Sequence, residues 1–279
     1  LINQRLEDDK HKFAAQLTGL RDPGDKSVLH HKTLVAAGLE SSFCAIPWTH
    51  AATNANGTMR MCCQMIHSDP IAPHGQIFNT DGTPVLASDN VIDNRNFPNW
   101  NIIRKKFING ERPDACKLCW DEESKGQRSK RMAVNSNFKS TIETALEETN
   151  SDGSIDVKRF PIKYWDLRFG NKCNLKCRTC GPSESNLWYS DYLKMGQNTI
   201  PLTNLPAAKL IIDDKGRPDV PGVFDWVDDT PLFDEIIANI NHVERLYFTG
   251  GEPTINLKHR EMLQSIIDAG QAHRIILEY

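Results

Sequence analysis

The pattern of apolar and polar residues changes near the middle of the chain. After a polar stretch at 150–153, strand-like segments at 164–169 and 243–248 alternate with helix-like segments at 183–195 and 256–269. A third strand begins near residue 273, and the proline-rich segment 196–230 is expected to be an irregular insertion. Strands that alternate with helices predict a parallel sheet with right-handed crossovers.

The first 150 residues follow a different pattern. Residues 43–63 predict a hairpin around the turn-rich segment 54–57. Residues 98–109 predict a helix that ends at Gly110, and Ser140 with Glu143 predicts the capped start of another. We therefore expect a small α+β domain over 1–150 and an α/β domain over 151–279.

Composition narrows the classes of function. The chain has 279 residues, of which 39% are hydrophobic and 25% charged, and its formal net charge is -3. This charge gives no general attraction to nucleic acid or to an acidic membrane surface. No apolar run has the length of a membrane span, and the charged segment 1–20 does not resemble a secretory signal. We expect a cytoplasmic protein, and a fragment of a longer one, because it begins at Leu1 and stops inside an apolar run at Tyr279.

The eight cysteines are the most informative residues. In a reducing compartment, cysteines grouped at short spacing favour metal binding over disulfides. Cys173, Cys177 and Cys180 directly follow the strand at 164–169. Three thiolates on one loop can hold three irons of a [4Fe–4S] cluster and leave the fourth iron open to another ligand. A zinc knuckle or chance clustering is the alternative, but gaps of three and then two residues are unusual for zinc.

A second motif, Gly250-Gly251-Glu252-Pro253, directly follows the strand at 243–248. Two glycines let the main chain approach a ligand closely, and exposed carbonyls there could accept hydrogen bonds from an ammonium group. A plain turn from strand to helix explains the same four residues equally well.

Together these two motifs resemble the radical S-adenosylmethionine (SAM) superfamily over residues 160–279. The resemblance implies that Cys173, Cys177 and Cys180 bind a [4Fe–4S] cluster and that Gly250, Gly251, Glu252 and Pro253 contact the methionine end of SAM. It also implies the N-terminal part of a partial (β/α) barrel, with about three of the family's six strand–helix units before the chain ends. The residue before the last cysteine is often aromatic in the family, whereas here it is Thr179.

A third group, Cys44, Cys62, Cys116 and Cys119, lies in the first 150 residues and could assemble four thiolates. This group resembles the auxiliary-cluster modules, called twitch or SPASM, of many radical SAM enzymes, which usually follow the barrel. The resemblance implies a second [4Fe–4S] cluster, while a structural zinc site remains the alternative from the residue types alone. Cys63 is left over and could replace Cys62 or be a buried thiol.

The sequence thus predicts a radical SAM enzyme, an oxidoreductase that cleaves SAM at a [4Fe–4S] cluster. The 5′-deoxyadenosyl radical formed abstracts hydrogen from an unknown substrate, for which a peptide is the candidate by analogy. Its expected partners are SAM and a reductant such as a flavodoxin or ferredoxin. The alternative is a non-catalytic metalloprotein, either zinc-stabilised or an iron–sulfur electron carrier. His30, His31 and His67 show no metal spacing, and the basic run 125–131 is expected to face solvent.

Overall fold

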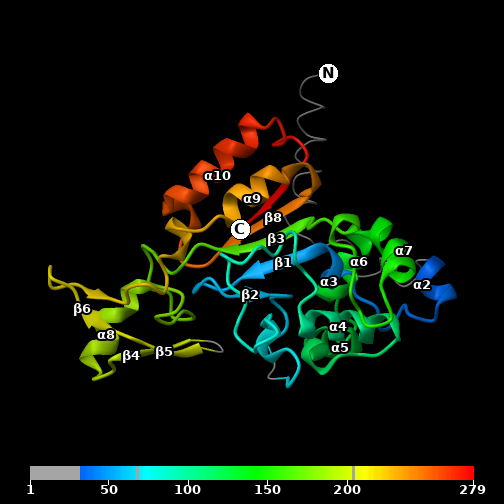
Figure 1. Cartoon of the computed structure of the whole chain (residues 1–279). Coiled ribbons are helices and arrows are strands. Elements are labelled where there is room, and N and C mark those ends of the chain that lie inside the picture. Colours follow the sequence, from blue (N-terminus) through cyan, green and yellow to red (C-terminus); the bar gives the residue numbers. More distant parts are fainter. Residues whose placement is uncertain (1–31, 67–68, 203–204) are drawn as a thin grey trace.

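A five-stranded sheet forms the centre of the computed structural model, which describes residues 32–66, 69–202 and 205–279 (Figure 1). The strand order is β2-β1-β3-β8-β9. The strands are β1 (His50–Thr53), β2 (Met59–Arg60), β3 (Tyr164–Arg168), β8 (Arg245–Thr249) and β9 (Ile276–Glu278). β1, β3, β8 and β9 are parallel, and β2 pairs antiparallel with β1. The predicted parallel sheet with strands near 164, 243 and 273 is therefore confirmed.

One face of this sheet is apolar and carries two helices, α9 (Leu232–Ala238) and α10 (Leu257–Asp268) (Figure 1). Side chains alternate between the faces of a strand, so Trp165 and Leu167 of β3 point to the same side. Both are fully buried in the core cluster that includes Phe233 of α9 and Met262 of α10. The helix expected at 256–269 is confirmed as α10, which buries His259, Met262 and Ile266, whereas Ile267 is 57% exposed.

The opposite face, called the polar face below, is lined by charged and aromatic residues. In β3, Tyr164, Asp166 and Arg168 alternate with the buried apolar residues. Cross-strand register places His50 opposite Tyr164, and Ala52 lies between Arg60 and Asp166. On the other side of β3, Arg245 and Tyr247 are opposite Tyr164 and Asp166. The polar face is thus formed by His50, Ala52, Arg60, Tyr164, Asp166, Arg168, Arg245 and Tyr247.

The N-terminal helices gather near the amino ends of the strands (Figure 1). They are α2 (Lys32–Ala36), α3 (Ile46–Thr49), α4 (Pro98–Ile108), α5 (Lys117–Ser124), α6 (Lys130–Asn137) and α7 (Lys139–Glu148). The helix predicted at 98–109 is confirmed, but no side chain caps α7, so the expected role of Ser140 is wrong. The hairpin around 54–57 forms between β1 and β2, whereas residues 46–49 are helical.

The expected boundary at residue 150 does not separate two cores. β1 from the first half pairs with β3 from the second, and one hydrophobic cluster extends from Leu34 to Ile275. The physical reason is that the short hairpin cannot bury its own faces and completes the sheet of the following segment instead.

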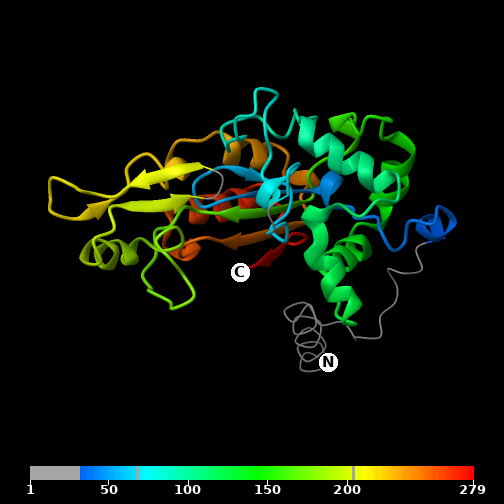
Figure 2. The ribbon, with the colours of Figure 1, turned by 90° about the horizontal axis from the view of Figure 1, so that it is seen from below.

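The insertion is more regular than expected. It contains two small antiparallel pairs, β4 (Thr199–Leu202) with β5 (Leu205–Lys209) and β6 (Ile211–Ile212) with β7 (Pro218–Asp219). The helix expected at 183–195 precedes it and is shorter than predicted, with α8 covering only Tyr189–Lys194. These elements extend away from the sheet as an arm (Figure 2). A small cluster around Ile200, Leu210 and Phe224 gives this arm its own core.

Short 3-10 helices connect several of these elements: η1 (Pro73–Gly75), η2 (Asp114–Cys116), η3 (Val157–Arg159), η4 (Asn186–Trp188), η5 (Trp226–Asp228), η6 (Ile240–His242) and η7 (Pro253–Ile255). In the described residues the central sheet is open, and no barrel is closed. No helix in the same part of the chain is both long and apolar enough to cross a membrane. His30, His31 and His67 lie outside the described residues.

Candidate metal centres

The three cysteines expected to hold a cluster lie in a loop at the carboxyl end of β3. This segment, residues 170–182, is called the cysteine loop below. Cys177 is exposed, while Cys173 and Cys180 are half-buried. The amide of Leu175 donates a hydrogen bond to Cys173 Sγ over 3.3 Å, and the Cys173 amide donates to Asn186 Oδ1 over 3.1 Å. Side-chain contacts from outside the loop therefore fix its backbone while its thiols stay accessible.

The Gly250-Gly251 motif packs directly against this loop. The Gly251 amide donates to the Gly170 carbonyl over 3.1 Å, and the Glu252 amide donates to the Lys172 carbonyl over 2.8 Å. A Cβ on Gly251 would lie 2.0 Å from the Lys172 oxygen, so no other residue fits this position without rearrangement. Gly250 has a φ of 109°, which also favours glycine. The glycines therefore join the carboxyl ends of β8 and β3.

The rest of the motif starts the next helical segment. Glu252 Oε1 accepts hydrogen bonds from the amide and the hydroxyl of Thr254, over 3.1 and 2.5 Å, and these bonds lower the pKa of Glu252. Pro253 is buried and opens η7. The Glu252 carboxylate thus orders the turn, and the backbone of Gly250 and Gly251 stays close to the cysteine loop.

The second group of cysteines lies beneath the opposite end of the sheet. Cys44, Cys62, Cys116 and Cys119 line one pocket together with mostly apolar side chains. Cys44 precedes α3, Cys62 follows β2, and the pair Cys116 and Cys119 lies where η2 meets α5. The structure therefore brings together residues that are 75 positions apart in the sequence (119 − 44).

Backbone amides point at three of these sulfur atoms. The Gln64 amide donates to Cys62 Sγ over 3.4 Å. The amides of Ile46 and Arg131 donate to Cys44 and Cys119. Hydrogen bonds of this kind favour the thiolate, which is the form that binds a metal.

Without a metal, burial opposes that form. Burial, with the neighbouring Cys119 next, raises the pKa of Cys44 to about 12. Burial followed by Cys44 raises the pKa of Cys116 well above its ordinary value, and burial also raises that of Cys119. These thiols are therefore protonated at neutral pH until a metal ion replaces their protons. The donor set fits a four-thiolate centre, and it suits zinc and iron–sulfur alike.

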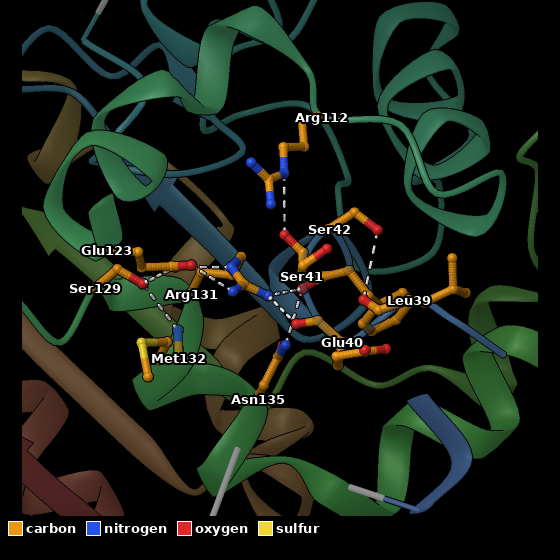
Figure 3. Close-up of polar contacts among 11 residues, drawn as sticks. Leu39, Glu40, Ser41, Ser42, Arg112, Glu123, Ser129, Arg131, Met132 and Asn135 are labelled. Carbon is orange, nitrogen blue, oxygen red and sulfur yellow. Dashed lines mark hydrogen bonds and ion pairs between the residues drawn. The ribbon is translucent and has the colours of Figure 1, made fainter. Parts of the chain in front are cut away.

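A buried arginine, Arg131, connects the segments that carry two of these cysteines, and Figure 3 shows its contacts with Glu123 and Glu40. Arg131 is only 1% exposed and forms an ion pair with Glu123, at 2.6 Å from Oε2. It also donates to the carbonyls of Glu40 and Phe43 over 3.0 and 2.9 Å. Because Phe43 precedes Cys44, this network ties the Cys44 segment to α5, which carries Cys119.

The spare cysteine belongs to a polar cluster beside the pocket. Lys130 Nζ donates to Cys63 Sγ over 3.0 Å and to the Tyr164 hydroxyl over 3.2 Å. Asp166 is 1% exposed, and neither of its carboxylate oxygens accepts a hydrogen bond. Burial first, and the nearby Cys63 thiol second, raise the pKa of Asp166 to about 7. Cys63 thus contacts the polar face of the sheet.

The two cysteine groups lie at opposite ends of β3. The polar cluster contacts β3 at Tyr164, and the cysteine loop begins after Arg168 at the other end of the strand. At 3.3 Å per residue, these two residues are roughly 13 Å apart along the strand. Among the described residues, no three His, Cys, Asp or Glu side chains stand at the spacing of a metal-ligand set. Within the four-cysteine pocket, and separately within the cysteine loop, the thiols are therefore grouped but do not have the geometry of metal ligands.

Sequence reasoning missed several residues of these sites. The basic run 125–131 was expected to face solvent, but Arg131 is buried and Lys130 is half-buried at the pocket. The Cys62-Cys63 pair beside a hairpin was a signal for such cations, because buried thiolates need positive partners. Lys172 is exposed and pairs with Asp228 over 3.3 Å. No family model, curated protein or solved structure matches the chain.

Proposed function

We propose that the chain is a radical SAM enzyme, with its cluster on Cys173, Cys177 and Cys180. The observation that carries this proposal is the contact between the two motifs: Gly251 and Glu252 donate backbone hydrogen bonds to the loop that leads into Cys173. Two motifs that are about 70 residues apart in sequence meet at the carboxyl edge of a parallel sheet, where α/β enzymes bind their ligands. A simple turn from strand to helix would not require Gly251 and Glu252 to form hydrogen bonds with the cysteine loop.

The residues present fit such a cluster by the chemistry of the donor set. Three thiols lie on one loop, and Cys177 is exposed. A [4Fe–4S] cluster bound there would supply the electron that breaks a carbon–sulfur bond of SAM. The chain itself would hold the cluster with three thiolates, present the Gly250-Gly251 backbone to the SAM amino group, and enclose the substrate over the polar face.

We also propose that Cys44, Cys62, Cys116 and Cys119 hold a second [4Fe–4S] cluster. Its support is the shared pocket, the amides that point at three of the sulfurs, and the cations Lys130 and Arg131 in its lining. Buried positive charge stabilises an anionic four-thiolate centre. The centre lies on the far side of β3 from the cysteine loop, where it would shape the substrate site or carry electrons to it.

Anaerobic reconstitution followed by iron analysis tests both centres. We expect about eight irons per chain, at four per cluster. Replacing Cys173, Cys177 and Cys180 with Ala should remove about half of this iron, and replacing Cys44, Cys62, Cys116 and Cys119 with Ser should remove the other half. Each variant serves as the control for the other.

The activity test is incubation of the wild-type chain with SAM and dithionite. We expect 5′-deoxyadenosine from the wild type and none from the Cys173, Cys177 and Cys180 variant. A full complement of iron without any 5′-deoxyadenosine would leave an iron–sulfur electron carrier. Zinc in place of iron at the four-cysteine pocket would refute the second cluster and indicate a structural site.

A further inference from the structure

The polar face of the sheet carries more positive than negative charge. Arg60 donates only to backbone carbonyls, those of His74, Met65 and Cys63, over 2.9, 3.1 and 3.4 Å. Lys130 donates to a thiol and a phenol. The carboxylate of Asp166 accepts no hydrogen bond from either cation. In a chain whose net charge is -3, this is a local excess of cations around one buried carboxyl, Asp166, which lies near both of them.

Arg168 adds a further positive charge at the carboxyl edge. The residue is half-buried, and its backbone amide donates to the Thr53 hydroxyl over 2.8 Å. Its guanidinium lies near enough to Asp166 to oppose the rise in pKa that burial causes in that carboxyl. Burial, followed by the nearness of Arg168, lowers the pKa of Arg60, which places the two guanidinium groups close together. Two guanidinium groups that share one buried carboxyl, Asp166, are only partly compensated, so a further anion would stabilise this arrangement.

Arg168 lines a pocket with a polar wall. Asn54 and Asn56 reach it from the turn after β1, and Ser183 and Glu184 reach it from the segment just after the cysteine loop. Ala55, Leu202 and Phe224 complete its lining. We call this the Arg168 pocket. It measures about 80 Å³, several times the roughly 10–15 Å³ that one water molecule needs. Its position, five residues before Cys173, is next to the proposed reaction centre.

One carboxylate shares the pocket. Glu184 Oε2 accepts a hydrogen bond from the Gly181 amide over 3.0 Å, so this side chain is held by the cysteine loop. It forms no ion pair with Arg168. The five donors of Arg168 therefore remain available, and their planar fork matches a carboxylate or a phosphate group.

We propose that the Arg168 pocket binds an anionic group of the substrate, a carboxylate or a phosphate, and positions it beside the cysteine loop. That the anion belongs to the substrate rests on the proposed function, whereas anion binding itself does not. Arg168 is the anchor, Arg60 adds long-range attraction, and Glu184 opposes binding by its negative charge. The two residues of the pocket thus have effects of opposite sign, which a purely structural role would not produce.

The test is isothermal titration of the full chain with its metals, under anaerobic conditions at low ionic strength. The probes are inorganic phosphate and glutarate. We expect Arg168→Gln to weaken binding of the preferred probe at least tenfold and Arg168→Lys to weaken it less. Glu184→Gln should tighten binding, since it removes the opposing charge and keeps an oxygen that can accept from Gly181.

Arg217→Gln is the matched control, because Arg217 is an exposed arginine on the arm that pairs with Asp213. It should leave probe binding unchanged. A higher affinity for phosphate would indicate a phosphate ester as substrate, and a higher affinity for glutarate would indicate a carboxylate. The proposal is overturned if neither probe binds saturably, or if Arg168→Gln and the wild type bind within twofold of each other. Formation of 5′-deoxyadenosine by the wild type is scored separately, so the proposed function and the anion site can fail independently.

Discussion

Replacement of Asp166 by Asn should stabilise the protein, by an amount that depends on pH. The carboxyl is 1% exposed and accepts no hydrogen bond. Its pKa rises from an ordinary value of 3.8 to about 7, chiefly through burial. The native state thus holds its proton at a pH where the unfolded chain has released it. Stability from this group is complete below the unfolded pKa and is lost as the pH rises through the native pKa.

The magnitude follows from these two values. At about 1.4 kcal/mol per pKa unit, burial of Asp166 costs about 4 kcal/mol at pH 8, where the carboxyl is charged. It costs about 2 kcal/mol at pH 5, where folding must protonate the carboxyl. Asn has a similar shape and no charge, so Asp166→Asn should gain these amounts over the wild type. Other titrating groups cancel when the two proteins are compared at the same pH.

Urea denaturation of both proteins at pH 5 and pH 8, under anaerobic conditions, measures the difference. We expect the advantage of the variant to be larger at pH 8 by about 2 to 3 kcal/mol. An advantage that is equal at the two pH values would refute the assigned burial cost. A variant less stable than the wild type at pH 8 would show that Lys130 and Asp166 form a favourable ion pair instead.

Three further predictions concern the metal centres. Gly251→Ala should destabilise the fold by about 1–3 kcal/mol in urea denaturation and lower the iron content of the cysteine loop, because its Cβ would clash with the Lys172 carbonyl. Gly181→Ala is the control, because a Cβ at this position has room. Equal effects of the two substitutions would contradict the packing argument. Arg131→Met should cost about 3–5 kcal/mol, because it leaves Glu123 without its ion-pair partner. Lys125→Met, at an exposed position, should change stability little, and similar losses in the two variants would show that burial of the ion pair is unimportant. In a chain lacking Cys173, Cys177 and Cys180, the Kd for Co²⁺ should rise at least about a thousandfold for each unit by which the pH falls, because the protonated thiols of Cys44, Cys116 and Cys119 must all release protons. A Kd independent of pH would exclude binding at the four-cysteine pocket.

The sequence predicted the elements whose pattern is set locally. The strand around Trp165 and Leu167 and the helix that buries Met262 and Ile266 have clear periodicity, and both are confirmed. β1 could not be predicted as part of the same sheet. Its sequence, His-Ala-Ala-Thr, has neither alternation nor a long apolar run, and only pairing with β3 makes it a buried strand.

The candidate sites also contain residues that the local sequence pattern predicts and residues whose environment depends on long-range packing. Spacing along the chain located the cysteine loop and the glycine motif. The hydrogen bonds from Gly251 to Gly170 and from Glu252 to Lys172 explain their proximity. The burial of Arg131 and of Asp166 depends on which distant segments pack against them. Charge patterns in the sequence show where charges are, but only tertiary packing decides which of them lose their water.

The pairing of β1 with β3 also bears on the order in which the molecule assembles. His50 and Tyr164 are 114 residues apart (164 − 50), and closing so long a loop is entropically costly and slow. Cys62, Cys116 and Cys119 all lie inside this loop. A metal ion bound by these thiols would shorten the flexible loop between the two strands before they pair. Metal binding at the four-cysteine pocket would then lower the entropic cost of closing this loop, and it would speed the pairing of β3 with β1 during folding.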